Sequence, residues 1–327
     1  MTTISTFHQG VAGITSGWIV TCAGGTDLYY RRYHSADPVA VTEDLLAWRV
    51  TYSAVAGDGG EGVLVAFVSG GVVYAALSED EGATFGPPTP LEVEVDSEAA
   101  PAVVVWRATD GLRALVAWGG ATGLGAALYA RGEWEALGNP STSTSDARFP
   151  SLAVDPATGR MWCAWRAKVG TAYHVRLARS DDDGATWTLP AKVVGGMDPS
   201  LAWDGSRLWL GYHTGGQEAK VGVVPLTSTA TFAPTTLGTP GLFVAVAAAA
   251  GQVVAIWSRY AYRTAATNDA ARSVAGAALV DGSWVPWPGS SEGYQVQGSA
   301  AISLDGTRIA VAWSDRTDET VRLVEGP

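Results

Sequence analysis

The feature that most constrains this chain is a short apolar segment that usually ends in an aromatic residue and recurs seven times. The copies are residues 18–22 (WIVTC), 63–67 (VLVAF), 114–118 (ALVAW), 161–165 (MWCAW), 208–212 (LWLGY), 253–257 (VVAIW) and 309–313 (IAVAW). Only the first copy lacks the closing aromatic residue. Successive copies lie roughly 45 to 56 residues apart, which indicates a repeat architecture rather than a set of unrelated elements.

Each copy is rich in Val, Ala, Ile and Trp and is bounded by Gly, Asp or Ser, which predicts a buried β-strand. A preceding strand ends in an Asp- and Gly-containing turn, and the clearest cases are 151–154, 200–203 and 300–304. A third strand follows the copy, for example at 72–77, 126–130, 174–179 and 221–226, and a fourth comes after it. Four strands in each repeat are typical of a β-propeller blade.

We therefore predict an all-β protein whose 327 residues form one β-propeller domain, 1–327, of seven four-stranded blades, with six blades as the alternative. The last repeat supplies only three strands, at 300–304, 308–314 and 320–324. We expect residues 1–7 to pair there, so that N- and C-terminal strands together close the ring and cover an exposed edge.

Charge and hydropathy exclude several classes of partner. The formal net charge of −11 argues against nucleic acid, which needs clustered Lys and Arg. The most apolar stretch, 242–256, is too short to cross a bilayer as a helix, so we expect no membrane insertion. Residues 1–10 do not resemble a signal peptide, which predicts synthesis in the cytoplasm. The two cysteines, Cys22 and Cys163, lie in apolar runs and indicate no disulfide framework.

Two turns share the pattern S-x-D-x-G-x-T followed by an aromatic residue. The first contains Ser78, Asp80, Gly82, Thr84 and Phe85, and the second contains Ser180, Asp182, Gly184, Thr186 and Trp187. This pattern resembles the Asp-box, or bacterial neuraminidase repeat, of sialidases and other propellers. The resemblance implies a structural turn between the third and fourth strands of a blade. There the Asp accepts backbone N–H bonds, the Gly takes a positive φ and the aromatic ring packs between blades.

The same resemblance implies that a ligand would bind on the face opposite the Asp-boxes, where second strands lead to third strands and one blade leads to the next. The candidates on that face are Arg148, Arg166, His213, Arg259, Tyr260, Tyr262, Arg263, Asp315 and Arg316. Arg148 is expected in the loop before the fourth blade. Arginine forks and tyrosine rings suit a glycan or an anionic ligand. The alternative is that these side chains form ordinary contacts between blades.

We predict neither a metal nor a cofactor. The four histidines show no metal-ligand spacing, and the acidic run 181–183 includes Asp182 of an Asp-box turn. The sequence also lacks a nucleophile elbow, a zinc-protease motif and a phosphate-binding loop.

Two functions remain in competition. The first is a non-catalytic sialidase-like propeller that recognises a surface glycan or another protein, or serves as a subunit of a larger assembly. By fold analogy such an assembly is a phage tail, spike or fibre, so the protein would be virion-associated. The family's early Phe-Arg-Ile-Pro string is absent, and the nearest match, 148–150 (RFP), has an altered order.

The alternative is a divergent exo-sialidase-type glycoside hydrolase. Its carboxylate clamp would be Arg166, Arg259 and Arg316, its nucleophile Tyr260 or Tyr262, and its acid Asp146 or Asp315.

Overall fold

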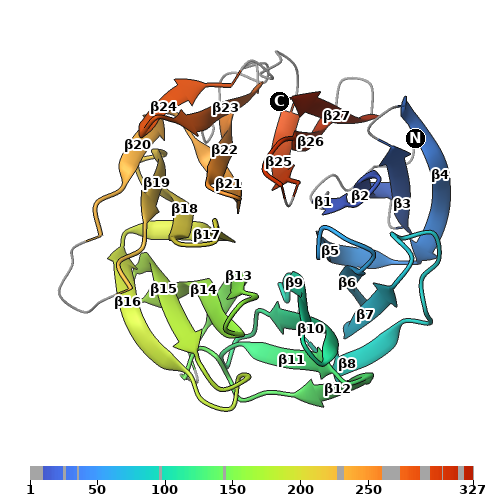
Figure 1. Ribbon diagram of the computed structural model, residues 1–327. Helices are drawn as coiled ribbons and strands as arrows, with labels where there is room; N and C mark the ends of the chain where they lie inside the picture. The colour runs from blue at the N-terminus through green and yellow to red at the C-terminus, as the bar shows by residue number, and fades with distance from the viewer. Residues whose placement is uncertain are drawn as a thin grey trace.

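The chain folds into seven antiparallel sheets that stand as blades around a central axis (Figure 1). The computed structural model describes residues 10–24, 27–34, 37–95, 98–142, 145–226, 232–259, 273–287, 295–303, 305–315 and 320–326. Within these residues six blades have four strands and the seventh has three. The predicted all-β propeller with seven blades is confirmed.

The strands follow one another outward from the axis in each blade. Blades 1 and 2 contain β1 (Gly10–Ile14), β2 (Gly17–Gly24), β3 (Asp27–His34), β4 (Asp37–Ala47), β5 (Val50–Gly57), β6 (Val63–Ser69), β7 (Val72–Ser78) and β8 (Thr89–Val93). Blades 3 and 4 contain β9 (Pro101–Ala108), β10 (Gly111–Trp118), β11 (Gly125–Ala130), β12 (Glu133–Ala136), β13 (Ala147–Asp155), β14 (Arg160–Val169), β15 (Ala172–Ser180) and β16 (Thr188–Val194). Blades 5 and 6 contain β17 (Gly196–Trp203), β18 (Leu208–Thr214), β19 (Ala219–Val223), β20 (Thr235–Gly238), β21 (Leu242–Ala249), β22 (Gln252–Arg259), β23 (Ser273–Val280) and β24 (Ser283–Pro286). Blade 7 contains β25 (Gln295–Ile302), β26 (Ile309–Asp315) and β27 (Thr320–Gly326).

The seven recurring apolar segments are the second strands of the blades. A second strand lies between the first and third strands of its own sheet and also between two neighbouring blades. In β6, for example, every residue except the last is buried. The outer strands β12 and β24 are largely exposed and carry no such apolar run. The periodicity was visible because the second strands are covered on both faces along most of their length.

First strands begin earlier than their apolar residues predict. β13 and β17 start at Ala147 and Gly196, and each contains a β-bulge, between Arg148 and Ser151 and between Met197 and Ser200. The unpaired bulge residues include a proline, which a bulge tolerates because no ladder hydrogen bond is needed there. In the other direction, the strand predicted at 221–226 ends at Val223, shortly before Pro225.

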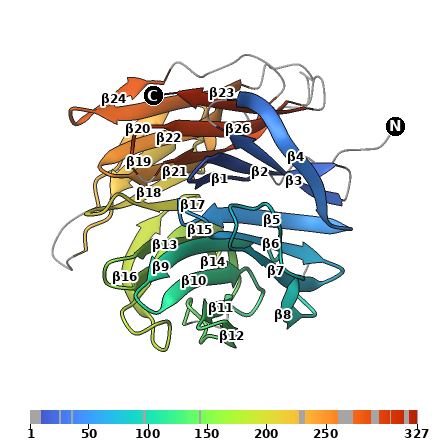
Figure 2. The ribbon, with the colours of Figure 1, turned by 45° about the vertical axis from the view of Figure 1, so that its right-hand side comes forward.

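Blade 7 packs directly on blade 1 and closes the ring (Figures 1 and 2). Val11, Trp18 and Val20 of blade 1 form one buried cluster with Ala310 and Ala312 of blade 7. The predicted pairing of residues 1–7 with the last blade lies outside the described residues and stays a prediction.

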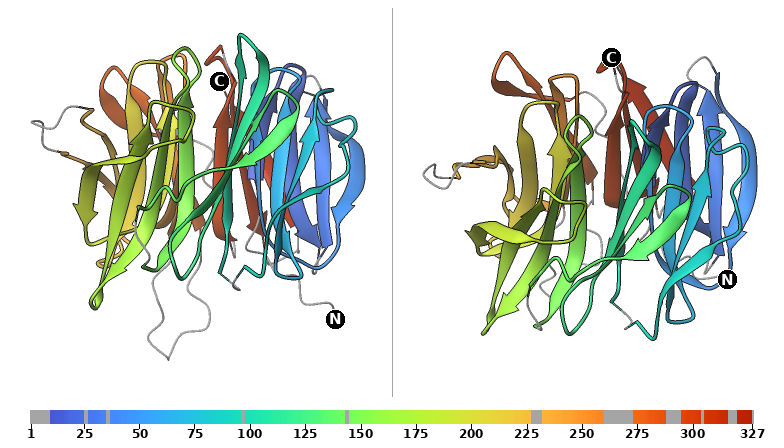
Figure 3. Two further views of the ribbon diagram at one scale, coloured as in Figure 1. Left: turned by 90° about the horizontal axis from the view of Figure 1, so that it is seen from below. Right: turned by 60° about the horizontal axis from the view of Figure 1, so that its bottom comes forward.

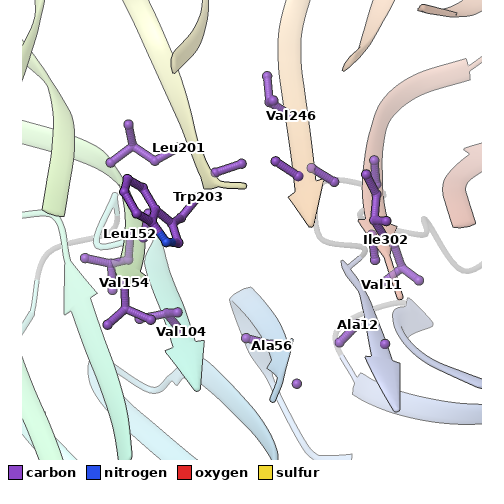
Figure 4. A pocket seen from close by; sticks show the side chains of 18 of the residues that line it. Val11, Ala12, Ala56, Val104, Leu152, Val154, Leu201, Trp203, Val246 and Ile302 are labelled. Atoms are coloured by element: carbon purple, nitrogen blue, oxygen red, sulfur yellow. The ribbon is translucent and has the colours of Figure 1, made fainter. Parts of the chain in front are cut away.

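Side chains of the first strands line a cavity of about 260 Å³ on the axis (Figure 4). The lining comes from all seven blades and consists of Val, Ala, Leu, Ile, Gly and Trp203. Leu201 and Trp203 of blade 5 approach this space from one side, and Val11 and Ile302 approach it from the other. The side chains at the centre of the ring are therefore apolar.

The strands run roughly along the axis, so the loops gather at the two ends of the ring (Figure 3). We call the end that bears the turns from first to second and from third to fourth strands the hairpin face. The other end, with the second-to-third turns and the links between blades, is the connector face. Within the residues described, no helix is long and apolar enough to span a membrane.

Candidate ligand-binding site

The two Asp-box turns have matching hydrogen bonds on the hairpin face. Ser78 donates from Oγ to Asp80 Oδ1 at 2.7 Å and accepts the N–H of Gly82 at 2.8 Å. Asp80 in turn accepts the N–H of Thr84 at 2.9 Å. Partial desolvation raises the pKa of Asp80, but hydrogen bonds from Thr84 and Ser78 outweigh it and hold that pKa at about 2. Equivalent bonds join Ser180, Asp182, Gly184 and Thr186.

Each of these two turns also packs its own blade against the preceding blade. Gly82 has a φ of 72°, and a side chain there would overlap Ile19 of blade 1. The Phe85 ring packs edge-on against Tyr30 of blade 1, with ring centroids 4.8 Å apart. In blade 4, Trp187 packs on the cluster shared with blade 3. The Asp-box residues are thus engaged in structural contacts, far from the connector face.

On the connector face, Arg166 of β14 is the centre of a cluster between blades 4 and 5. Its guanidinium carbon lies 4.3 Å from the ring centroid of Phe149 and 5.0 Å from that of Tyr173. Its Nη1 donates to Asp198 Oδ1 of blade 5 at 3.2 Å. The side chains of Arg166 and Asp198 keep 19% and 17% of their surface exposed. A cation beside two aromatic rings is therefore paired with a carboxylate and still reaches solvent.

His213 of β18 lies beside the same carboxylate but is fully buried. Its Nε2 is 3.9 Å from Asp198 Oδ2, and its ring meets Phe243 of blade 6 at a centroid distance of 5.9 Å. Neither ring nitrogen has a hydrogen-bond partner among the described residues. Burial lowers the pKa of His213, with Asp198 opposing this effect and Arg166 adding to it.

Phe149, Asp198 and Phe243 occupy equivalent bulge positions in three successive blades. Their φ values are 50°, 48° and 49°, a left-handed backbone that costs a residue other than glycine on the order of 1–3 kcal/mol. Arg166 and His213 occupy equivalent positions on the second strands, each lying between the bulge residue of its own blade and that of the next. We call these five residues the junction belt. Backbone strain of this kind is concentrated at functional sites.

The structure brings only some of the predicted site residues together. Arg166 and His213 come together in the junction belt. Arg148 lies within β13 and not in a loop, is nearly buried, and pairs through Nε with Asp146 at 2.7 Å. This corrects the prediction that Arg148 lies in the loop before the fourth blade. The reason is the β-bulge, which lets β13 extend through Pro150.

The remaining candidates lie further along the chain. Arg259 is exposed at the end of β22, and Asp315 ends β26. Tyr260, Tyr262, Arg263 and Arg316 lie outside the described residues.

Sequence reasoning missed Phe149, Tyr173, Asp198 and Phe243 as site residues. The available signal was a proline after a bulky or acidic residue at the start of an apolar strand, as in 149–150 (FP) and 198–199 (DP).

In the described part of the chain, no three His, Cys, Asp or Glu side chains gather as a metal site would require.

Solved structures of other propellers resemble this fold. AofleA from Arthrobotrys oligospora has a TM-score of 0.62 and 9% identity, covering 99% of this chain and 90% of that one. The SapL1 lectin in complex with α-methyl fucoside has a TM-score of 0.59 and 13% identity, covering 86% and 96%. The Aleuria aurantia lectin with Fucα1-6GlcNAc has a TM-score of 0.57 and 13% identity, covering 81% and 87%.

At these identities the likeness establishes the propeller fold alone. No protein-family model matches the sequence, and no curated protein matches it. The sialidase resemblance therefore rests on the two turn motifs, which serve the structure of the hairpin face.

Proposed function

We propose that this protein is a glycan-recognition propeller that binds its ligand at the junction belt. The observation that carries the proposal is the partly exposed Arg166, which lies close to the rings of Phe149 and Tyr173 and is paired with Asp198. Aromatic rings offer flat apolar faces to the C–H face of a sugar. An arginine fork and a carboxylate respectively donate to and accept from its hydroxyl groups.

The fold comparison supports this proposal by analogy. SapL1 and the Aleuria aurantia lectin are propellers whose structures hold fucose-containing ligands. A shared fold does not transfer a ligand, so the argument depends on the side chains of the belt. The partner would be a glycan, free or carried by another protein.

The alternative, a divergent exo-sialidase, needs three arginines that converge on one carboxylate. Among the described residues the arginines of the connector face are used separately. Arg166 pairs with Asp198, Arg148 pairs with Asp146, and Arg259 is exposed at the end of its strand. This arrangement favours recognition over hydrolysis.

The test is a glycan-array screen run beside a fluorogenic sialoside hydrolysis assay. We expect the wild-type protein to bind a glycan without turnover and Arg166→Ala to lose that binding. The matched control is Arg160→Ala, which removes an arginine from the same strand, also paired with an aspartate, Asp181. Arg160 lies roughly 20 Å away, at the hairpin face. Equal loss in both variants, or sialoside turnover, would contradict the proposal.

Membership of a larger assembly, such as a phage tail, spike or fibre, stays a prediction from fold analogy. The same holds for a virion location, because the described residues offer no observation specific to it.

A further inference from the structure

We propose that the junction belt selects an uncharged saccharide and rejects sugars that carry a carboxylate. This inference rests on the proposed glycan-binding function and deepens it by naming the ligand class. The observation behind it is the charge balance of the belt. Arg166 supplies one positive charge, Asp198 supplies one negative charge 3.2 Å away, and the remaining members are Phe149, Phe243 and the imidazole of His213.

Two neighbouring cations on the connector face are paired as well. Arg148 is 2.7 Å from Asp146 and 3.8 Å from Glu98, and Lys220 is 3.5 Å from Glu218. Lys168 lies two residues beyond Arg166 on the same side of β14, but it is exposed. Solvent and salt screen a charge in that position, so it adds little attraction for an anion.

A ligand carboxylate would meet Asp198 wherever it met Arg166. Like charges within about 4–6 Å of each other are strongly disfavoured, and the ligand would have to displace Asp198 from its cation. A sugar hydroxyl avoids this conflict because it can donate to Asp198 and accept from Arg166 while the pair stays intact. Among the described residues Nη1 of Arg166 is hydrogen-bonded and Nε is buried, which leaves Nη2 to donate to such a hydroxyl.

The belt also resists rearrangement. Asp198 is held by a β-bulge with a left-handed backbone, and the guanidinium of Arg166 lies close to two rings. Separating this preorganised ion pair to admit an anion would therefore cost free energy. Rejection of acidic ligands through an unpaired like charge is a common source of binding specificity.

The test uses Asp198→Asn on an array of matched glycan pairs that differ only in a terminal sialic acid. Asparagine keeps the side-chain shape and tolerates the left-handed backbone. We expect the wild-type protein to bind the neutral member at least about tenfold more tightly than the sialylated member. In Asp198→Asn the guanidinium loses its partner, so binding to the sialylated member should rise several-fold and the preference should shrink or reverse.

Two further variants control this experiment. Asp198→Gly removes the carboxylate and suits the positive φ, so it should shift the preference in the same direction. Asp181→Asn makes the same change of net charge at the hairpin face, where Asp181 pairs with Arg160, and should leave the preference unchanged.

The outcomes separate this inference from the proposed function. A wild-type protein that prefers sialylated glycans overturns the inference but leaves glycan recognition standing. A wild-type protein that binds no glycan overturns the proposed function itself. Folded Asp198→Asn and Asp198→Gly variants that keep the wild-type preference, or that lose both ligand classes equally, also overturn the inference, because the Asp198 charge would not discriminate between them.

Discussion

At the scale of single residues, His213 is a buried histidine beside a carboxylate. It is fully buried, lies 3.9 Å from Asp198, and has no described hydrogen-bond partner at either ring nitrogen. A buried polar group without a partner costs about 1–3 kcal/mol. Its burial lowers the pKa, so the folded protein favours the neutral imidazole.

This environment predicts a loss of stability in mild acid. Because the folded pKa lies below the unfolded value of about 6.5, the unfolded chain binds more protons as the pH falls through that value, and the free energy of unfolding decreases. His213→Phe removes the titrating ring and should flatten the change between pH 7.5 and 5.5, as measured by urea denaturation. His34→Phe, the same substitution at a histidine of β3, is the matched control. Unaltered acid sensitivity in His213→Phe would refute this account.

At the scale of elements, the Asp-box turn joins local hydrogen bonding to packing between blades. Its serine is buried and satisfies two groups at once, with Ser78 and Ser180 exposed by only 2% and 1%. Its glycine has a positive φ and lies against the preceding blade, as Gly184 does against Leu137. One turn therefore stabilises both the end of a hairpin and the packing of one blade on the next.

Ser78→Ala and Ser180→Ala should each lower the free energy of unfolding by about 1–2 kcal/mol, because the N–H of the turn glycine loses its acceptor. The turns belong to different blades, so the double variant should show the sum of the two effects within a few tenths of a kcal/mol. Urea denaturation of the three variants measures both points. No loss in either single variant would mean that these turns do not stabilise the fold.

At the scale of the whole molecule, the ring closes where its last blade packs on its first. Among the described residues, Val11, Trp18 and Val20 form the closing cluster with Ala310 and Ala312. Trp18 supplies most of its bulk and is only 1% exposed. Truncating Trp18 therefore tests how much this junction contributes to stability.

Trp18→Ala should lower the free energy of unfolding by about 3–5 kcal/mol, the usual cost of truncating a buried tryptophan. The matched control is Trp162→Ala, which truncates a fully buried tryptophan at the junction of blades 4 and 5. Similar losses, each with a single unfolding transition in chemical denaturation, are expected if the ring unfolds as one unit. A loss below about 1 kcal/mol in Trp18→Ala alone would show that closure adds little.

The sequence by itself predicted the seven second strands, a ring of seven blades with six as the alternative, and the two S-x-D-x-G-x-T turns, because each depends on residues close together in the chain. Covered strands need apolar residues, and a tight turn needs its Asp and Gly within a few positions. The junction belt depends on more than that. Arg166 and Asp198 are 32 residues apart and meet only because blade 5 packs on blade 4.

A bulge decides which way Phe149, Asp198 and Phe243 point, and a single extra residue in a strand reverses the face of every side chain that follows. The resemblance to sialidase propellers, applied to the repeat pattern, therefore selected Arg166 and His213 as candidates but could not supply their partners. Packing of one blade on the next, together with the bulges, placed a carboxylate beside the arginine and aromatic rings around it. That arrangement was decided by the tertiary structure alone.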